Sequence, residues 1–188
     1  MPITVFRGRI RLKVMNVLER FKYCPACGSS HFETNSEKSK LCRSCGFEYF
    51  VNPSAATAAF IMNERGELLV ERRKREPAKG MLDLPGGFCD VDENIVQGLR
   101  REVREETGLK VVSERFVMSC PNVYLYSGVE IPTMDLFFEC EVTAGEEPVA
   151  MDDAAECMWI PLREIRIEQF GLRSVRQALY EFIEQKRV

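Results

Sequence analysis

Residues 84–109 read LPGGFCDVDENIVQGLRREVREETGL, a glycine-rich loop followed by a pattern typical of an amphipathic helix. Apolar residues recur at helical spacing over 95–107. Asp90, with Glu93 three residues later, predicts a capping box at the start of the helix, and Gly108 predicts its end. We therefore expect a helix over 95–107 that a tight loop precedes.

One edge of this helix is acidic. At 100° per residue, Glu102, Glu105 and Glu106 lie together beside the apolar face that Leu99 and Val103 form. Grouped carboxylates repel one another, so this edge is either an ordinary solvated surface or a site for a cation. Oxygen ligands suit Mg²⁺ or Mn²⁺, which also bind phosphate oxygens and lower the pKa of water. The second interpretation indicates hydrolysis of a phosphate-containing substrate.

The spacing of these residues resembles a known motif. From Gly87 the chain continues with five residues, Glu93, seven residues and then REVREETGL from Arg101. This pattern is similar to the Nudix box of the Nudix hydrolase family at each required position. The resemblance implies an α/β fold, namely an α/β/α sandwich with a mixed sheet, and a hydrolase that cuts pyrophosphate bonds.

The same resemblance implies roles for individual residues. Glu102 and Glu106 would be the main ligands of Mg²⁺ or Mn²⁺, with Glu105 beside them, and Gly86 would contribute its carbonyl oxygen. In the family the arginine orients the neighbouring glutamates, and one glutamate serves as general base, though which one varies between members. The supporting residues of the catalytic set are then Glu93 and Arg101.

Four cysteines form two CxxCG turns separated by 14 residues: Cys24, Cys27, Cys42 and Cys45. Each turn directs two thiolates at one metal, and four thiolates complete a tetrahedral site with no position for water. The pattern therefore predicts a zinc ribbon with structural Zn²⁺, and a redox role for the CxxC turns is the less favoured alternative. The other four cysteines show no spacing and are expected to be reduced thiols in the cytoplasm.

Composition and charge limit the class of protein. Hydrophobic residues make up 45% and charged residues 29% of the 188 residues, which is typical of a globular protein and leaves no segment for a membrane. Residues 1–11 alternate apolar and basic residues, which favours an edge strand or a frayed arm over a nucleic-acid-binding arm and does not indicate export. Met15 is an alternative start.

We expect residues 1–50 to form an N-terminal arm and zinc ribbon, and residues 51–188 to form the Nudix hydrolase domain. Residues 1–50 carry 9 Lys and Arg against 4 Asp and Glu. Zinc on four thiolates adds about two negative charges, so the electrostatic case for nucleic acid as a partner is weak. The expected partner is a small nucleotide, and the family resemblance adds a possible homodimer.

Further elements follow from local patterns. Two apolar runs over 55–62 and 67–71 flank a turn that contains Gly66, which predicts a hairpin. Strands are expected over 110–118, 134–142 and 158–161. A C-terminal helix places apolar residues on one face: Leu172, Val175, Leu179, Phe182 and Ile183. The basic stretch from Arg72 to Arg75 is either a solvated loop or a means of attracting an anionic substrate.

A cysteine ribbon ahead of a Nudix domain resembles the NADH pyrophosphatase branch of the family, over residues 20–188. The marker of that branch is SQPWPFPxS, and residues 119–127 read SCPNVYLYS, so Tyr124 falls where the marker has an aromatic residue. Phe88 takes the position of an aromatic residue that stacks on the base in that branch; a core phenylalanine is the alternative. Glu156, three residues before Trp159, matches a further metal ligand.

The expected function is metal-dependent hydrolysis of the pyrophosphate bond in a nucleoside diphosphate linked to another moiety, such as NAD(H) or an ADP-ribose-like compound. The reaction would release a nucleoside monophosphate. Nucleotide sugars and nucleoside triphosphates are alternative substrates. A non-catalytic Nudix module that senses a nucleotide or binds nucleic acid is the alternative from another class, and the intact set of glutamates disfavours it.

Overall fold

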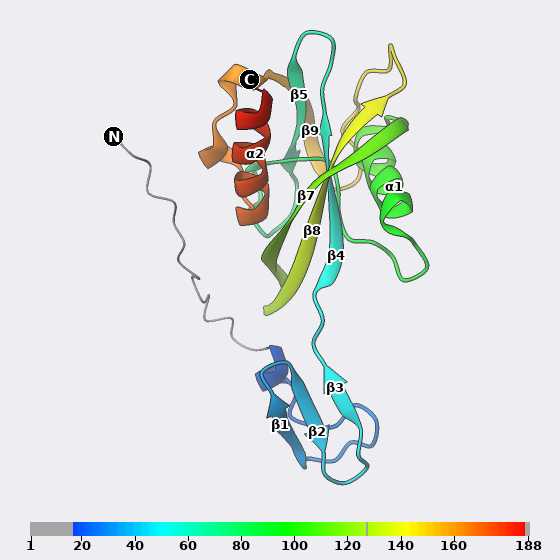
Figure 1. Ribbon diagram of the computed structural model, residues 1–188, viewed down its shortest axis with the longest axis vertical. Helices are drawn as coiled ribbons and strands as arrows, with labels where there is room; N and C mark the ends of the chain where they lie inside the picture. The colour runs from blue at the N-terminus through cyan, green and yellow to red at the C-terminus, as the bar shows by residue number, and fades with distance from the viewer. Residues whose placement is uncertain (1–16, 127, 187–188) are drawn as a thin grey trace, which may run out of the picture. The chain divides into compact units, whose positions relative to one another are not determined.

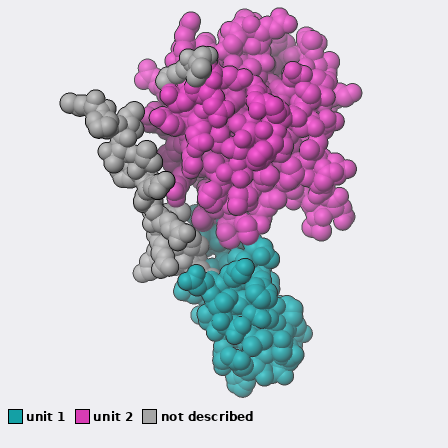
Figure 2. Space-filling view, viewed as in Figure 1, with its two compact units in different colours: residues 1–52, 125–131 teal, residues 53–124, 132–188 magenta. Residues whose placement is uncertain are grey.

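The computed structural model describes residues 17–126 and 128–186 (Figure 1). The chain divides into two compact units, shown in two colours in Figure 2. One unit comprises residues 1–52 with 125–131, and the other comprises residues 53–124 with 132–188. The arm expected over 1–11 and the alternative start at Met15 lie outside the described residues.

The first unit is built from short elements around the cysteines. A 3-10 turn, η1 (Val17–Arg20), precedes an antiparallel sheet of β1 (Phe32–Ser36), β2 (Ser39–Cys42) and β3 (Glu48–Phe50). Its small core consists of Cys24, Phe32 and Cys42, with Tyr49 packed against it. A core this small needs a further stabilising group, and the four cysteines could hold a metal that would supply it.

The second unit contains two three-stranded sheets. In the first, β8 (Val129–Val142) lies between β4 (Ser54–Ile61) and β7 (Val111–Tyr126), and it pairs with β4 in parallel. In the second, β5 (Glu67–Arg73) pairs antiparallel with both β6 (Leu82–Asp83) and β9 (Ala154–Pro161). Parallel and antiparallel pairs together make the architecture mixed.

Two helices cover opposite faces of these strands, α1 (Ile95–Thr107) and α2 (Arg173–Lys186) (Figure 1). Alternate residues of β4 point to opposite sides, so Phe60 packs in the cluster of α2 and Ile61 packs in the cluster of α1. Because both faces of the strand are covered, its inner residues are apolar without alternation. The expected α/β/α sandwich with a mixed sheet is confirmed.

The hairpin expected over 55–71 is wrong in its pairing. The turn itself forms, since the Gly66 N–H donates to the Asn63 carbonyl. Beyond one isolated bridge between Met62 and Leu68, however, β4 and β5 enter different sheets. The reason is that β4 gains eight paired positions with β8, from Ser54 with Thr133 to Ile61 with Cys140. A local turn fixes where the chain reverses but not which strand becomes the partner.

The later strands are longer than expected, and the C-terminal helix forms as expected except that Leu172 lies just ahead of it and is only partly buried. β7 continues through Pro121 to Tyr126, and as the edge strand of its sheet it tolerates a residue without an N–H. In α2, Val175, Leu179, Phe182 and Ile183 are buried. Three-residue 3-10 turns, η2 (Leu162–Glu164) and η3 (Ile167–Gln169), lead into this helix. None of the helices among the described residues has the length and apolar character to cross a membrane.

Candidate active site

The glycine-rich loop lies directly against β4. The N–H groups of Thr57 and Ala59 donate to the carbonyls of Gly87 and Pro85, which extends the strand pairing into the loop. Gly86 has φ 148°, and a Cβ atom there would come within 2.1 Å of the Thr57 carbonyl oxygen. A side chain at Gly87 would meet the Glu102 carboxylate at 2.7 Å. Glycine is therefore required for the loop to approach both the strand and the helix.

The capping box of α1 lies four residues beyond the expected one, at Asn94 and Gln97 in place of Asp90 and Glu93. Asn94 is the N-cap residue: its side chain accepts from Val96 N and Gln97 N, and the Gln97 side chain accepts from Asn94 N. The Asp90 N–H instead donates to Glu93 Oε2, which closes a turn ahead of the helix. Gly108 ends the helix in the left-handed conformation, as expected.

Arg101 joins the loop to the helix. Its guanidinium donates to both oxygens of Glu93 at 2.7 and 2.9 Å, to Glu102 at 2.9 Å, to Glu105 at 2.8 Å and to the Phe88 carbonyl at 3.0 Å. These hydrogen bonds, that with Glu93 first, raise the pKa of Arg101. The side chain thus stays charged and orients three carboxylates at once.

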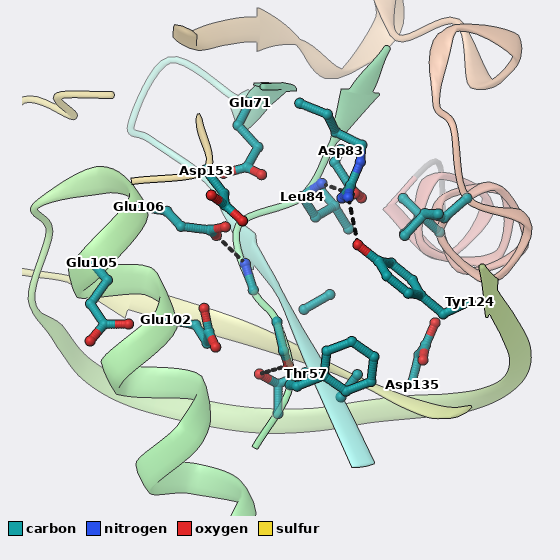
Figure 3. Close-up of a pocket in the computed structure, with 18 of the residues that line it drawn as sticks. Thr57, Glu71, Asp83, Leu84, Glu102, Glu105, Glu106, Tyr124, Asp135 and Asp153 are labelled. Carbon is teal, nitrogen blue, oxygen red and sulfur yellow. Dashed lines mark hydrogen bonds and ion pairs between the residues drawn. The ribbon is translucent and has the colours of Figure 1, made fainter. Parts of the chain in front are cut away.

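The carboxylates of α1 face a cavity of about 290 Å³ (Figure 3). Loop, helix and strand residues contribute to it, all of them from the second unit. The charged residues that line it are Glu71, Arg73, Arg75, Asp83, Asp90, Arg101, Glu102, Glu105, Glu106, Asp135, Asp152 and Asp153. Negative charges outnumber positive ones in this set, so the cavity favours a cation.

Glu106 lies deepest of the three helix glutamates, with 6% of its surface exposed. Its Oε2 accepts from the Gly86 N–H at 2.8 Å, which ties the helix to the loop. Burial raises the pKa of Glu106 well above its ordinary value and the Glu71 carboxyl adds to the rise, while the Gly86 hydrogen bond opposes it. Burial also raises the pKa of Glu102, against the effect of Arg101.

Three residues that the sequence patterns did not identify as ligands or catalytic residues also line the cavity: Glu71 and Arg73 on β5, and Asp83 on β6. Glu71 is 3% exposed, and burial, with the charge of Asp83, raises its pKa to about 8. Asp83 is buried and pairs with Arg73 at 2.5 Å. The sequence did contain a signal for Glu71, which directly follows the apolar run Leu68 to Val70. Side chains alternate along a strand, so Glu71 is expected on the same face as Leu69, which is buried.

The two aromatic residues named from the sequence lie together at the cavity. The rings of Phe88 and Tyr124 meet edge to face with centroids 5.3 Å apart. The Tyr124 hydroxyl accepts from Arg73 Nη2 at 2.9 Å, which fixes the ring (Figure 3). Phe88 is 36% exposed, so it is not a core phenylalanine. An exposed ring beside a charged cavity can stack on a base.

A hydrogen-bonded carboxylate closes the far side of the cavity. Asp135 accepts from Asn122 at 3.0 Å, from Thr133 at 2.6 Å and from Ser174 at 2.5 Å. Apolar side chains of β8 and α2 lie next to it, among them Phe137. Three donors satisfy this buried charge, so Asp135 holds β7, β8 and α2 in register.

The donor set of the cavity fits a hard divalent cation. Its ligands are carboxylate oxygens, and two of them, Glu71 Oε2 and Asp153 Oδ1, are buried without a hydrogen-bond partner. Among the described residues, only the four cysteines form a compact group of three or more ligand atoms. The carboxylates do not form such a compact group, and they are oxygen donors of the kind that Mg²⁺ binds together with several waters.

The model of the NUDIX domain family matches residues 52–183, which include the loop, the helix and the whole cavity. The chain belongs to the NUDIX family. The matched range includes every lining residue of the cavity.

Curated NUDIX proteins similar to this chain include the NAD-capped RNA hydrolase NudC of several Escherichia coli strains, for example strain ED1a. Identity is 28% over 138 residues, which cover 73% of this chain and 51% of the relative. The chain thus spans about half the length of the curated relatives it matches.

Solved NUDIX structures show the same fold. A NUDIX hydrolase from Nitrosomonas europaea has a TM-score of 0.69 at 20% identity and covers 89% of this chain and 93% of its own. The NUDIX domain of NrtR from Shewanella oneidensis, solved with ADP ribose, has a TM-score of 0.58 at 18% identity and covers 74% and 91% of the two chains.

One residue expected in the NUDIX site does not reach the cavity. Glu156 lies opposite Arg72 in the β5–β9 pair and bonds to its Nε at 3.0 Å on the exposed side. Asp152 and Asp153, just before β9, line the cavity instead. The cavity lining therefore does not include Glu156, because strand alternation turns this side chain away from α1, whereas the loop ahead of the strand turns Asp153 toward the cavity.

The cysteine cluster forms its own site in the first unit. Cys24 Sγ lies 3.7 Å from Cys45 Sγ, Cys27 Sγ lies 3.6 Å from Cys42 Sγ, and all four sulfurs are within 4.8 Å of one another. The N–H groups of the following glycines, Gly28 and Gly46, fold back to the carbonyls of Cys24 and Cys42. All eight cysteines fall within the described residues, and all are free of disulfides. Four sulfur ligands at this spacing fit zinc.

Proposed function

We propose that this chain hydrolyses the pyrophosphate bond of a nucleoside diphosphate linked to another moiety, with NAD(H) or an ADP-ribose-like compound as substrate. One observation carries the proposal. The carboxylates of α1 and the aromatic pair of Phe88 and Tyr124 line the same cavity, so one molecule can contact both groups. The acidic part suits phosphate chemistry through a metal, and the aromatic part suits a base.

Glu102, Glu106 and Asp153, with Glu105 beside them and the Gly86 carbonyl as a further oxygen, would hold Mg²⁺ or Mn²⁺. The bound cation would neutralise phosphate charge and lower the pKa of water. Arg101 keeps Glu102 and Glu105 in place through its hydrogen bonds.

The two ends of the substrate would contact different residues. Phe88 and Tyr124 would bind the base by stacking, and Arg73 holds the Tyr124 ring in position. Arg75, which lines the cavity and has a largely exposed side chain, would attract the phosphates. A glutamate of α1 would accept the proton of the attacking water. The products would be a nucleoside monophosphate and the phosphorylated remainder.

The relatives support this substrate class. The NudC proteins bear the name of NAD-capped RNA hydrolases, and their match covers 73% of this chain. A 5′-terminal NAD group carries the same linkage as free NAD(H), so both belong in the test. The ribbon and its Zn²⁺ would have a structural role. The protein would work in a reducing cytoplasm. It would form a homodimer, which size-exclusion chromatography of the purified protein tests.

The test is turnover of purified, zinc-loaded protein with Mg²⁺. The panel comprises NADH, ADP-ribose, a nucleotide sugar, a nucleoside triphosphate and a short NAD-capped RNA, with products separated by chromatography. We expect cleavage of NADH or ADP-ribose to a nucleoside monophosphate and a loss of at least about 100-fold for Glu106→Gln. Preference for a nucleotide sugar or triphosphate, or nucleotide binding without turnover, would overturn the proposal.

A further inference from the structure

Glu71 is a buried carboxylate in the cavity that does not belong to the loop or helix of the site. It lies on β5, has 3% of its surface exposed, and is one of the residues labelled in Figure 3. Its Oε2 is buried and has no hydrogen-bond partner. A buried, unpaired oxygen of this kind is costly, so it indicates a missing partner.

The neighbours of Glu71 sharpen this conclusion. Burial and the charges of Asp83 and Asp153 raise the pKa of the Glu71 carboxyl group, and a hydrogen bond with Glu106 lowers it, so the oxygen without a partner is Oε2 alone. Figure 3 shows Glu71, Glu106 and Asp153 directed toward one part of the cavity. Asp153 Oδ1 is the other buried side-chain oxygen without a hydrogen bond among the described residues. The two unsatisfied oxygens thus lie in one acidic corner that also contains the deepest helix glutamate.

The arginines of the cavity are engaged elsewhere. Arg73 attracts Glu71 at longer range, but its hydrogen bonds go to Asp83, Tyr124 and the Pro77 carbonyl. The guanidinium of Arg101 donates its hydrogen bonds to Glu93, Glu102, Glu105 and the Phe88 carbonyl of the loop. Arg75 Nη1 lies 3.0 Å from Asp153 Oδ1 as an ion pair outside hydrogen-bond geometry. No side chain among those described thus makes a hydrogen bond to the free oxygen of Glu71.

We propose that Glu71 is an additional ligand of the divalent cation and reaches it from β5, across the cavity from α1. The proposal rests on the proposed function, because it requires a cation in this cavity. A cation between Glu71 and Glu106 would offset the repulsion between two adjacent buried carboxylates and would satisfy the orphaned oxygen. The metal site would then join β5 to the helix, in addition to the ligands on α1 and its loop.

Mn²⁺ binding tests this proposal without reference to turnover. Free Mn²⁺ is measured by electron paramagnetic resonance during titration of the full chain with its cysteine site already loaded with zinc. Glu71→Gln keeps the size of the side chain and removes its charge. We expect it to weaken Mn²⁺ binding by about 10- to 100-fold.

Glu67→Gln is the matched control. Glu67 lies on the same strand, outside the cavity, and bonds to Asn63 and Arg65. The dissociation constant of the Glu67→Gln variant for Mn²⁺ should be within about twofold of that of the unaltered protein. Glu106→Gln is the reference for loss of an α1 ligand.

The outcomes separate this inference from the proposed function. If the unaltered protein binds no Mn²⁺ in the cavity, both fail. If Glu106→Gln loses binding while Glu71→Gln retains it within about twofold, only the role of Glu71 fails. Anomalous diffraction from Mn²⁺ in crystals of the unaltered protein avoids any folding defect of the variant. Density bridging Glu71 and Glu106 supports the proposal, and Mn²⁺ bound without contact to Glu71, directly or through one water, overturns it.

Discussion

Asp153 and Glu156 are three positions apart in the chain, yet only Asp153 faces the cavity. Asp153 precedes β9, where the chain is free to turn toward α1. Glu156 lies within β9, where its position relative to Arg72 directs the side chain to the exposed side. Its surface ion pair contributes little to stability. The chemical type of the two residues is the same, and the backbone decides between them.

Substitution of these two residues tests their placement. We expect Asp153→Asn to lower kcat/KM in Mg²⁺ by about 10- to 100-fold, because it removes a charge from the cation site. Glu156→Gln, which breaks only the exposed pair with Arg72, should change kcat/KM by less than about threefold. Steady-state assays of both variants on the preferred substrate measure these changes. A larger loss for Glu156→Gln than for Asp153→Asn would indicate that Glu156 is the ligand.

Gly86 is a second residue whose backbone determines its identity. Gly86→Ala places a Cβ at 2.1 Å from the Thr57 carbonyl at φ 148°, so the loop must move away from β4. We expect a loss in the free energy of unfolding on the order of 3 kcal/mol, measured by urea denaturation. Gly66→Ala is the control: its φ is 73° with nothing within 4 Å, and it should cost about 1 kcal/mol. Equal losses would show that crowding at Gly86 is unimportant.

At the scale of the element, α1 has two functions on adjoining faces. Leu99 and Val103 are fully buried against the strands, while Glu102 and Glu106 point into the cavity. The packing of the apolar face therefore sets the position of the carboxylates. The hydrogen bond from Gly86 N to Glu106 adds a second constraint. Tightly held side chains keep ligands at fixed spacing.

The start of α1 provides a test at this scale. Asn94→Ala removes the side chain that accepts from Val96 N and Gln97 N, so we expect a loss of about 1 kcal/mol in the free energy of unfolding. Asp90→Ala should cost less than about 0.5 kcal/mol, because Asp90 donates through its backbone and its side chain is largely exposed. Urea denaturation of both variants measures the difference, and a larger loss for Asp90→Ala would place the cap at Asp90.

At the scale of the whole molecule, the two units offer two different sets of candidate metal ligands. The first unit offers four sulfurs, which select zinc, and the second offers carboxylate oxygens, which select Mg²⁺ or Mn²⁺. The described core of the ribbon has three buried hydrophobic residues, so we expect its stability to depend on a metal bound by the cysteines. The cavity lies in a unit with two large hydrophobic clusters and does not depend on the zinc site for its packing.

Cys42→Ser tests this independence. Removal of one thiolate should lower bound zinc well below one ion per chain and lower the melting temperature of the ribbon. Mn²⁺ binding in the cavity should stay within about twofold. Cys140→Ala, which changes a buried cysteine outside the cluster, should retain its zinc. Metal analysis and calorimetry measure both effects, and loss of Mn²⁺ binding at unchanged melting temperature would contradict a purely structural role for the ribbon.

Several features were predictable because their signals are local. The helix over 95–107 is bounded by Gly108 and by polar residues ahead of Ile95, and the apolar face follows from the helical period. The cysteine cluster follows from two short turns of the same kind. The hairpin prediction was wrong because strand pairing is a long-range choice, and the paired residues of β4 and β8, such as Ser54 and Thr133, are 79 positions apart in the chain. Glu71 and Asp153 were missed because neither belongs to a local motif.

By itself the sequence determined which chemical groups α1 and the loop before it bring to the candidate site. The interval from Gly87 to Gly108 specifies a loop, a helix and the glutamates on that helix, because backbone conformation and helical period act over a few residues. Only the tertiary structure decided which other residues join them. Glu71, Asp83 and Asp153 reach the cavity because β5, β6 and the start of β9 pack beside α1, and their burial and charge depend on neighbours distant in the chain.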